Sequence, residues 1–452
     1  MGTFRKGFAF FMEQGLGKSL TTLENFDRLV RERLATRLVV VGPNSFKGGW
    51  ADEIGKHHYH FDPHIFESGS SLNDAFLRKD FDRPPVLIIN YEAVRSEATQ
   101  EYIKRFIAGR NAMIAADESI KLKTHNSDQT KSMLALSPLF EYQRILSGKP
   151  TTQGPHDLWA QMRFIRQLNG KNYYAFRNAF CRMGGFRMKK VLGVQNEEIL
   201  HELINEHIFR ATKKDWTDLP PKVYLQREYK MTPEMKSMYR QMQDEFVLML
   251  DDETISVNAA ITKYIKLAQI QCGFIHNEEG RVRVLVEPGK NPRLNALKET
   301  IEDEVTGKFS VVYHHKYSLT LLQEALAAYR PVAITGGMLP GDIDEVKRVF
   351  NNDPRCRVIL LQDDASKYGH TLLAGPAPED KCYTQLFFEN SYNLDTRAQI
   401  EDRHHRHGQT SDSVNYIDLV GSPLDKAVTR ALADKENIFQ TVFKHIRSIP
   451  SV

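Results

Sequence analysis

A glycine-rich segment near the start of the chain has the residue types that bind phosphate. It follows the pattern Gly-x-Gly-Lys-Ser, with Gly15, Gly17, Lys18 and Ser19. Glycines permit a tight turn that directs backbone N–H groups at a phosphate, lysine adds a positive charge, and a serine hydroxyl can bind Mg²⁺. The longer phosphate-loop pattern has glycine where this chain has Met12. The segment predicts a nucleotide site, and the alternative is a glycine-lysine turn on the surface.

Two adjacent carboxylates, Asp117 and Glu118, lie about a hundred residues further along the chain and follow an apolar run at 112–116. One carboxylate at the end of a buried strand can hold Mg²⁺ through water, and a second can accept the proton of an attacking water. We expect the first role for Asp117 and the second for Glu118. An Asp-Glu pair alone is a weak signal, so this assignment depends on the phosphate loop that precedes it.

Two arginines near the end of the chain, Arg403 and Arg406, lie three residues apart in the segment 399–409. On a helix this spacing places both side chains on one face. If they reach a γ-phosphate bound by another lobe, they can stabilise transition-state charge as arginine fingers. Zinc binding by the three neighbouring histidines is an alternative, but no cysteine or carboxylate spacing supplies further ligands. A solvated basic helix is the other alternative.

The apolar pattern predicts the elements that position these side chains. A continuous apolar run at 8–12 precedes the phosphate loop, and apolar residues recur at helical spacing over 20–30. Further strands are expected at 37–41, 85–90, 112–116 and 143–146. Such strands, alternating with helices, form an open parallel sheet whose ligands gather at the carboxyl ends of the strands. We therefore expect the phosphate loop and the two carboxylates at one edge of a sheet.

The length of 452 residues favours two α/β lobes rather than one. We place lobe 1 at 1–215, with a mostly helical insertion at about 157–207, and a proline-containing linker at 216–230. Lobe 2 is expected at 231–452, with a helical insertion at about 231–275. Its strands are expected at 309–313, 332–335, 358–361, 384–388 and 414–420.

The composition narrows the class of protein. A net charge of +4, with 26% charged and 41% hydrophobic residues, indicates a soluble globular chain in which any nucleic acid is held by a local basic patch. The four cysteines form no Cys-x-x-Cys pair, which predicts neither a zinc site nor a disulfide framework and fits a reducing cytosol. No apolar run approaches the roughly 18 residues of a membrane span.

Together these motifs resemble the SNF2-like branch of superfamily 2 helicases and translocases. The segments that carry the resemblance are 13–19 (motif I), 40–45 (Ia), 117–123 (II), 146–153 (III), 360–373 (a loose V) and 399–409 (VI). The pattern Arg-Ala-Thr-Lys-Lys-Asp at 210–215, followed by Leu-Pro-Pro-Lys at 219–222, is more particular to SNF2-like proteins than to helicases generally. The resemblance implies two RecA-like parallel-sheet lobes.

The resemblance also implies a function and its residues. It implies a DNA-dependent ATPase or helicase that uses ATP and Mg²⁺ and closes two lobes on the nucleotide. The implied nucleotide contacts are Glu13, Gly15, Leu16, Gly17, Lys18, Ser19, Gly369 and Gln399, with Ser19 and Asp117 for the metal. The implied catalytic residues are Lys18, Glu118, Arg403 and Arg406. The implied DNA contacts are Asn44, Ser45, Lys121, Lys123 and Lys149, and for each of them a solvated surface residue is an equal alternative.

The compact chain is similar to branch-migration proteins of large phages, which move forks and Holliday junctions. We therefore expect a monomeric DNA motor in the cytoplasm of a bacterium or a phage-infected cell. A duplex-DNA translocase that displaces proteins without separating strands is an alternative, and an RNA helicase is a less favoured one. Stimulation of ATPase by duplex, single-stranded DNA or RNA distinguishes them.

Three departures from the family pattern have consequences. Motif II usually ends in a histidine that helps couple hydrolysis to nucleic-acid binding, but this chain has Ile120, so the coupling must be made differently. Motif III has Lys149 where threonine is usual. The chain begins a few residues before motif I, without the upstream segment whose glutamine reads adenine, and we therefore expect weak discrimination between ATP and other nucleoside triphosphates.

Overall fold

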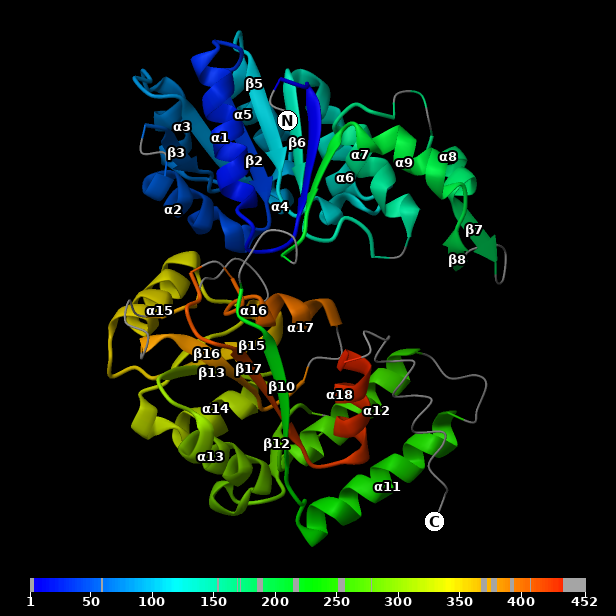
Figure 1. Ribbon diagram of the computed structural model, residues 1–452, viewed down its shortest axis with the longest axis vertical. Helices are drawn as coiled ribbons and strands as arrows, with labels where there is room; N and C mark the ends of the chain where they lie inside the picture. The colour runs from blue at the N-terminus through cyan, green and yellow to red at the C-terminus, as the bar shows by residue number, and fades with distance from the viewer. Residues whose placement is uncertain are drawn as a thin grey trace. The chain divides into compact units, whose positions relative to one another are not determined.

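The computed structural model describes residues 4–57, 60–152, 154–168, 170, 172–184, 190–213, 219–250, 257–277, 279–366, 372–374, 380–390, 394–406 and 408–433. The chain divides into two compact units, unit 1 at Met1–Asp218 and unit 2 at Leu219–Val452 (Figure 1). Gly369 lies outside the described residues, as do Gln153 of motif III, Lys214 and Asp215, and His407 of motif VI. Within the described residues, no helix has both the length and the apolar character needed to cross a membrane.

Unit 1 is built on a seven-stranded sheet in the order β3-β4-β2-β5-β6-β1-β9, and every pairing in it is parallel. The strands are β1 (Gly7–Met12), β2 (Arg37–Gly42), β3 (Asp62–Ile65), β4 (Pro85–Asn90), β5 (Ala112–Ala116), β6 (Tyr142–Leu146) and β9 (Ile208–Ala211). The parallel α/β sheet expected for lobe 1 is therefore confirmed. The two edge strands, β3 and β9, were not predicted, because each is only four residues long and carries polar residues.

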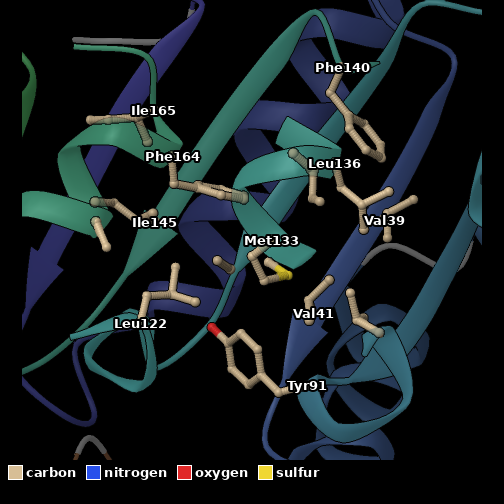
Figure 2. Packing of buried hydrophobic residues seen from close by; sticks show 14 of the residues in the cluster. Val39, Val41, Tyr91, Leu122, Met133, Leu136, Phe140, Ile145, Phe164 and Ile165 are labelled. Carbon is tan, nitrogen blue, oxygen red and sulfur yellow. The ribbon is translucent and has the colours of Figure 1, made fainter. Parts of the chain in front are cut away.

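The apolar run of β1 is continuous because the strand is buried on both faces. Phe8, Phe10 and Met12 pack with Leu23 and Phe26 of α1 (Lys18–Arg31) on one face. Ala9 and Phe11 belong to the core on the other face, which includes residues of α5 (Glu97–Ile107), α6 (Asp128–Leu136) and α7 (Leu158–Phe164). Figure 2 shows this second core, where Val39 and Val41 of β2 lie beside Met133 and Leu136 of α6. A doubly covered strand of this kind is typical of parallel sheets.

The remaining elements of unit 1 surround the sheet. They are α2 (Lys47–His57), α3 (Ser71–Arg78), α4 (Tyr91–Val94), α8 (Tyr173–Phe180), β7 (Cys181–Gly184), β8 (Lys190–Val194) and α9 (Glu197–Asn205). The prediction that the insertion at 157–207 is mostly helical missed β7 and β8, which form an antiparallel hairpin. Strands this short have little apolar periodicity, so the sequence pattern did not indicate them.

Unit 2 contains a six-stranded parallel sheet in the order β10-β17-β16-β13-β15-β14. Its strands are β10 (Lys222–Glu228), β13 (Lys308–Tyr313), β14 (Val332–Ile334), β15 (Val358–Gln362), β16 (Cys382–Phe387) and β17 (Val414–Val420). The described residues also include a small hairpin of β11 (Phe274–His276) and β12 (Val282–Val284). The second parallel α/β sheet is confirmed, but β10 lies within the segment predicted as a linker at 216–230 and pairs along its whole length with β17.

Helices flank the sheet of unit 2. They are α11 (Pro233–Leu250), α12 (Val257–Gln271), α13 (Pro292–Glu304), α14 (Lys316–Ala325), α15 (Pro340–Asn352), α16 (Asp363–Ser366), α17 (Leu394–Glu401) and α18 (Pro423–Ala433). The strands β13, β15 and β16 supply a buried core with α13 and α14 on one side. Each unit therefore has a core of its own, and in parallel sheets of this kind ligands bind at the carboxyl ends of the strands.

Candidate nucleotide site

The phosphate-loop candidate occupies the turn between β1 and α1. Gly15 and Gly17 have φ angles of 89° and 78°, in the left-handed region. Side chains other than glycine are strained in that region, which explains why glycine occupies both positions. Gly17 is also the N-cap of α1, and no side chain caps that end of the helix. Backbone N–H groups at such a helix start attract anions, so the local geometry fits a bound phosphate.

The loop that follows β6 packs directly against the phosphate-loop candidate. A Cβ atom placed on Gly148 would lie 3.4 Å from the backbone nitrogen of Gln14 and 3.7 Å from Nζ of Lys18. The ammonium group of Lys18 itself donates to the carbonyl of Met12, at 3.1 Å. Lys18 thus lies beside the start of the segment that follows β6.

Glu13 has a structural contact in this region. Its backbone N–H donates to the carbonyl of Ala211 at 3.0 Å, and its carboxylate accepts from the backbone N–H of Lys213 at 2.8 Å. The carboxylate of Glu13 therefore attaches the end of β9 to the loop. These contacts position the start of the loop, and the predicted nucleotide contact of Glu13 stays a prediction beside them.

Asp117 and Glu118 follow β5 directly, at the same edge of the sheet. Asp117 is 5% exposed; one carboxylate oxygen accepts from the indole N–H of Trp50 at 2.9 Å, and the other accepts from the backbone N–H of Glu118 at 2.9 Å. The hydroxyl of Tyr91 donates to the carbonyl of Asp117 at 2.8 Å. Glu118 has φ 49° and ψ 53°, a left-handed conformation that is costly for a residue with a side chain and recurs at functional sites.

The electrostatics of Asp117 suit a cation. Burial raises the pKa of its carboxyl, while the charge of Lys18, the Trp50 indole and the Glu118 N–H each oppose that rise. A bound cation would favour the ionised form further. Each carboxylate oxygen makes one of the hydrogen bonds given above, and a carboxylate offers about four lone-pair sites, so Asp117 can also hold a hydrated Mg²⁺. The hydroxyl of Ser19, in the first turn of α1, is the second predicted ligand.

Neither Trp50 nor Tyr91 was predicted as part of the site. Trp50 lies 67 positions from Asp117 in the chain, and Tyr91 lies 26 positions away. No spacing rule connects residues on separate elements of a sheet, so only the fold reveals these contacts.

The predicted DNA contacts of unit 1 follow three neighbouring strands. Asn44 is exposed and lies with Ser45 in a short 3₁₀ helix after β2. Lys121 is exposed and Lys123 half-buried, both after β5, and Lys149 is exposed after β6. Since β2, β5 and β6 are adjacent in the sheet, these residues share its carboxyl edge. Lys123 also donates to Oγ1 of Thr152 at 3.2 Å.

The arginine-finger prediction is corrected in part. Helix α17 ends at Glu401, so Arg403 and Arg406 lie in the turns that follow it, and the helical spacing argument for them is wrong. Arg403 is 2% exposed, whereas Arg406 is half-exposed. Gln399 is half-exposed on α17. Of the two arginines, Arg406 is the one accessible to a ligand.

The histidines beside these arginines have structural contacts. Nδ1 of His404 donates to the carbonyl of Leu372 at 2.8 Å, so Nε2 accepts from the hydroxyl of Ser310, also at 2.8 Å. Burial lowers the pKa of His404 to about 4, which keeps the ring neutral. Nε2 of His405 lies 3.0 Å from the carbonyl of Pro220. These contacts account for two of the three histidines without a metal.

Helix α17 carries a buried ion-pair cluster that was not predicted. The guanidinium of Arg397 donates to both oxygens of Asp418 at 2.7 and 3.1 Å, and to Glu401 at 2.8 Å. Burial opposes the charge of Arg397, but Asp418 and Glu401 together raise its pKa above the ordinary value. The spacing of Arg397 and Glu401, four residues apart, was the available signal for part of this cluster.

Comparison with known proteins identifies similar chains. Residues 5–273 match the SNF2-related domain family. The chain is 24% identical over 426 residues to the human "DNA annealing helicase and endonuclease ZRANB3", covering 91% of this chain and 36% of that protein. It is 24% identical over 476 residues to "TATA-binding protein-associated factor BTAF1" of Arabidopsis thaliana, covering 88% of this chain and 22% of that protein. It therefore spans about a fifth to a third of the length of these two relatives.

A phage protein and a solved structure are also similar. The chain is 23% identical over 302 residues to "Putative protein p41" of Acyrthosiphon pisum secondary endosymbiont phage 1, covering 64% of this chain and 62% of that protein. The solved structure is the "Sulfolobus solfataricus SWI2/SNF2 ATPase core in complex with dsDNA", at 19% identity and a TM-score of 0.42, covering 100% of this chain and 94% of that chain. Because the family match spans more than half of the chain, the resemblance found in the motifs is confirmed, and the protein belongs to the SNF2-related domain family.

Proposed function

We propose that this protein is an ATP- and Mg²⁺-dependent DNA motor that translocates on DNA and remodels branched structures such as forks and Holliday junctions. One observation supports this proposal most directly. The neighbouring strands β5, β6 and β1 carry the Asp117-Glu118 pair, the Ser147-Gly148-Lys149 segment and the phosphate-loop candidate at their carboxyl ends. A hydrolase that couples nucleotide chemistry to a second ligand needs such a shared edge.

The proposed roles follow from the chemistry of each residue. Backbone N–H groups of the loop and Lys18 bind the phosphates, and Ser19 and Asp117 hold Mg²⁺, which neutralises phosphate charge when bound. Glu118 accepts the proton of the attacking water. Arg406 is proposed as the arginine finger, since Arg403 is buried. Glu13, Leu16, Gln399 and Gly369 remain proposed nucleotide contacts, the last of them outside the described residues.

DNA is the proposed second ligand. The human relative has DNA annealing helicase in its name, although this chain covers only 36% of that protein. The proposed contacts Asn44, Ser45, Lys121, Lys123 and Lys149 would bind backbone phosphates and give little base specificity. The similarity to a phage protein supports a role in a bacterial or phage-infected cytoplasm. We propose that the protein acts as a monomer.

A duplex-DNA translocase that displaces proteins is the second candidate. The similarity to a relative named as a TATA-binding protein-associated factor favours it, since that name describes association with a DNA-bound protein. The motor residues would be the same in both functions. The nucleic acid that stimulates hydrolysis distinguishes them.

The test is a steady-state ATPase measurement on the wild type and on Glu118→Gln. Each is measured alone and with linear duplex, a four-way junction, single-stranded DNA and RNA. We expect the junction to stimulate the wild type most, and Glu118→Gln to lose about 100-fold or more of the stimulated rate while it still binds nucleotide. Glu101→Gln, at an exposed carboxylate of α5, is the matched control.

Each outcome separates the candidates. Equal stimulation by linear duplex and junction would favour the protein-displacing translocase. Stimulation by RNA alone would favour an RNA helicase. A wild-type rate that no nucleic acid changes would contradict the proposal of a nucleic-acid motor.

A further inference from the structure

A buried hydrogen-bond chain begins at the residue next to Glu118. Ser119 and Gln161 are both fully buried, and the hydroxyl of Ser119 donates to Oε1 of Gln161 at 2.7 Å. Nε2 of Gln161 donates in turn to the carbonyls of Pro150, at 2.7 Å, and Asp157, at 2.8 Å. Gln161, on α7, therefore connects the Asp117-Glu118 segment to the segment that follows β6.

The series of hydrogen bonds continues to the surface through Thr152. The carboxylate of Asp157 accepts from the backbone N–H of Thr152 at 2.7 Å and from its hydroxyl at 3.1 Å. The same hydroxyl oxygen accepts from Nζ of Lys123, at 3.2 Å. The series of hydrogen bonds thus ends at Lys123, a proposed DNA contact. An anion that binds the ammonium group of Lys123 can shift the group relative to Thr152 and so change this contact.

At its other end, the series of hydrogen bonds begins at Ser119, which is covalently joined to Glu118. Glu118 has left-handed backbone angles and precedes the 3₁₀ helix Ser119–Leu122, and the N–H of Lys121 donates to the carbonyl of Glu118 at 2.9 Å. The backbone of this segment is thus fixed on both sides of Ser119. A shift of Gln161 relative to Ser119 must therefore move the neighbouring Glu118 or break the hydrogen bond.

Position 120 does not supply a comparable link. The side chain of Ile120 has no donor or acceptor, and it directly follows Ser119. Ser119 provides a buried side-chain hydrogen bond from this segment to Gln161, which in turn donates to the carbonyl of Pro150 in the segment after β6. The hydroxyl group that connects the two segments through Gln161 therefore belongs to Ser119, one residue before Ile120.

We propose that the Ser119–Gln161 hydrogen bond couples phosphate contact at Lys123 to the position of Glu118, so that DNA binding raises the rate of hydrolysis. The proposal rests on the proposed function, because it assumes that DNA stimulates hydrolysis. Ser119 and Gln161 are positioning residues: they touch neither nucleotide nor DNA in this scheme. For binding, such coupling is reciprocal: nucleotide binding changes DNA affinity by the same factor by which DNA binding changes nucleotide affinity, and this equality does not extend to the rate of hydrolysis.

The test compares Ser119→Ala, Gln161→Met and the double variant with the wild type. Ser137→Ala is the matched control, because Ser137 is 2% exposed and its hydroxyl donates to the carbonyl of Phe164, away from the Asp117-Glu118 segment. Two ratios are measured for each protein: ATPase with and without duplex DNA, and duplex affinity with and without a non-hydrolysable ATP analogue and Mg²⁺. Thermal unfolding is recorded for all variants.

We expect Ser119→Ala to reduce both ratios by about three- to tenfold, the size expected from one buried hydrogen bond, while Ser137→Ala leaves them unchanged. The double variant should have ratios no lower than those of the single variant with the lower ratios, because each single substitution already removes the same hydrogen bond. The proposal is overturned if Ser119→Ala keeps wild-type ratios, or if Ser137→Ala lowers them equally. A wild type that DNA does not stimulate overturns the proposed function instead, and this inference with it.

Discussion

Trp50 shows how one distant side chain can orient a proposed metal ligand. Its indole is 2% exposed and donates to a carboxylate oxygen of Asp117. A carboxylate oriented by a buried donor binds a cation in one preferred geometry. Trp50 also lies on α2, which directly follows the 3₁₀ helix that contains Asn44, so this contact connects a proposed DNA contact segment with the proposed metal ligand.

We predict that Trp50→Phe raises the Mg²⁺ concentration needed for nucleotide binding. Phenylalanine keeps most of the packing but lacks the N–H donor, so the orientation of Asp117 is less fixed. Loss of a residue that hydrogen-bonds to a metal ligand typically lowers metal affinity by about tenfold. The measurement is binding of a fluorescent ATP analogue over a Mg²⁺ titration, with Trp159→Phe, at a buried tryptophan of the same unit, as the control. Identical Mg²⁺ midpoints in wild type and Trp50→Phe would refute the prediction.

At the residue scale, sequence patterns predicted the residues whose role depends on local geometry. Gly15 and Gly17 were predicted from the turn they form, and both have the expected left-handed backbone. Arg403 was assigned from helical spacing, but α17 ends before it and its side chain is buried, because tertiary packing rather than local spacing decides both. The Trp50 contact could not be predicted for the same reason.

At the scale of elements, the strongly apolar strands were predictable and the others were not. β1, β2, β4 and β5 are buried on both faces and therefore have nearly continuous apolar sequences, whereas β6 is equally buried but contains Gln143 and Arg144. β10 alternates between half-buried and exposed residues at the edge of its sheet, next to Pro220 and Pro221, so its sequence resembles a linker. Its partner, β17, is nearly 200 residues away and supplies the pairing that makes it a strand.

The position of α17 depends on the ion pairs that attach it to β17. The guanidinium of Arg397 meets Asp418 of β17 through two hydrogen bonds, and its central carbon lies 3.2 Å from the ring centroid of Phe387. Planar, forked donors make this arrangement possible, and an ammonium group cannot reproduce it. Because the helix leads into Arg403 and Arg406, its attachment also determines where those residues lie.

We predict that Arg397→Lys destabilises the protein by about 3 kcal/mol, since it leaves buried carboxylates incompletely paired. The measurement is the shift in the urea unfolding midpoint followed by circular dichroism. Arg348→Lys is the matched control, because Arg348 also binds a carboxylate, that of Glu345, through two hydrogen bonds, but at the surface. We expect little change in that variant, since exposed ion pairs contribute little. Equal shifts in the two variants would contradict a special role for the buried cluster.

At the scale of the whole molecule, the charge is nearly balanced, with 61 Lys and Arg against 57 Asp and Glu. General attraction between the protein and a polyanion is therefore weak, and DNA affinity has to come from local contacts. The proposed contacts at the carboxyl edge of the first sheet place Lys121, Lys123 and Lys149 after adjacent strands. When a local patch of this kind binds a duplex, a small number of the counterions condensed on the DNA are released.

We predict that the logarithm of duplex affinity falls linearly with the logarithm of salt concentration, and that Lys149→Ala reduces the magnitude of the slope by about 0.9. The loss should be the same for duplexes of different sequence, because phosphate contacts carry no base information. The measurement is fluorescence anisotropy with labelled duplexes over a salt series, with Lys104→Ala, an exposed lysine of α5, as the control. If Lys104→Ala changed the slope as much as Lys149→Ala, the charge would act over the whole surface and not at the edge that carries the proposed nucleotide site. A slope change confined to Lys149 would instead place the DNA backbone next to Gly148 and Lys18, where a phosphate contact can influence hydrolysis.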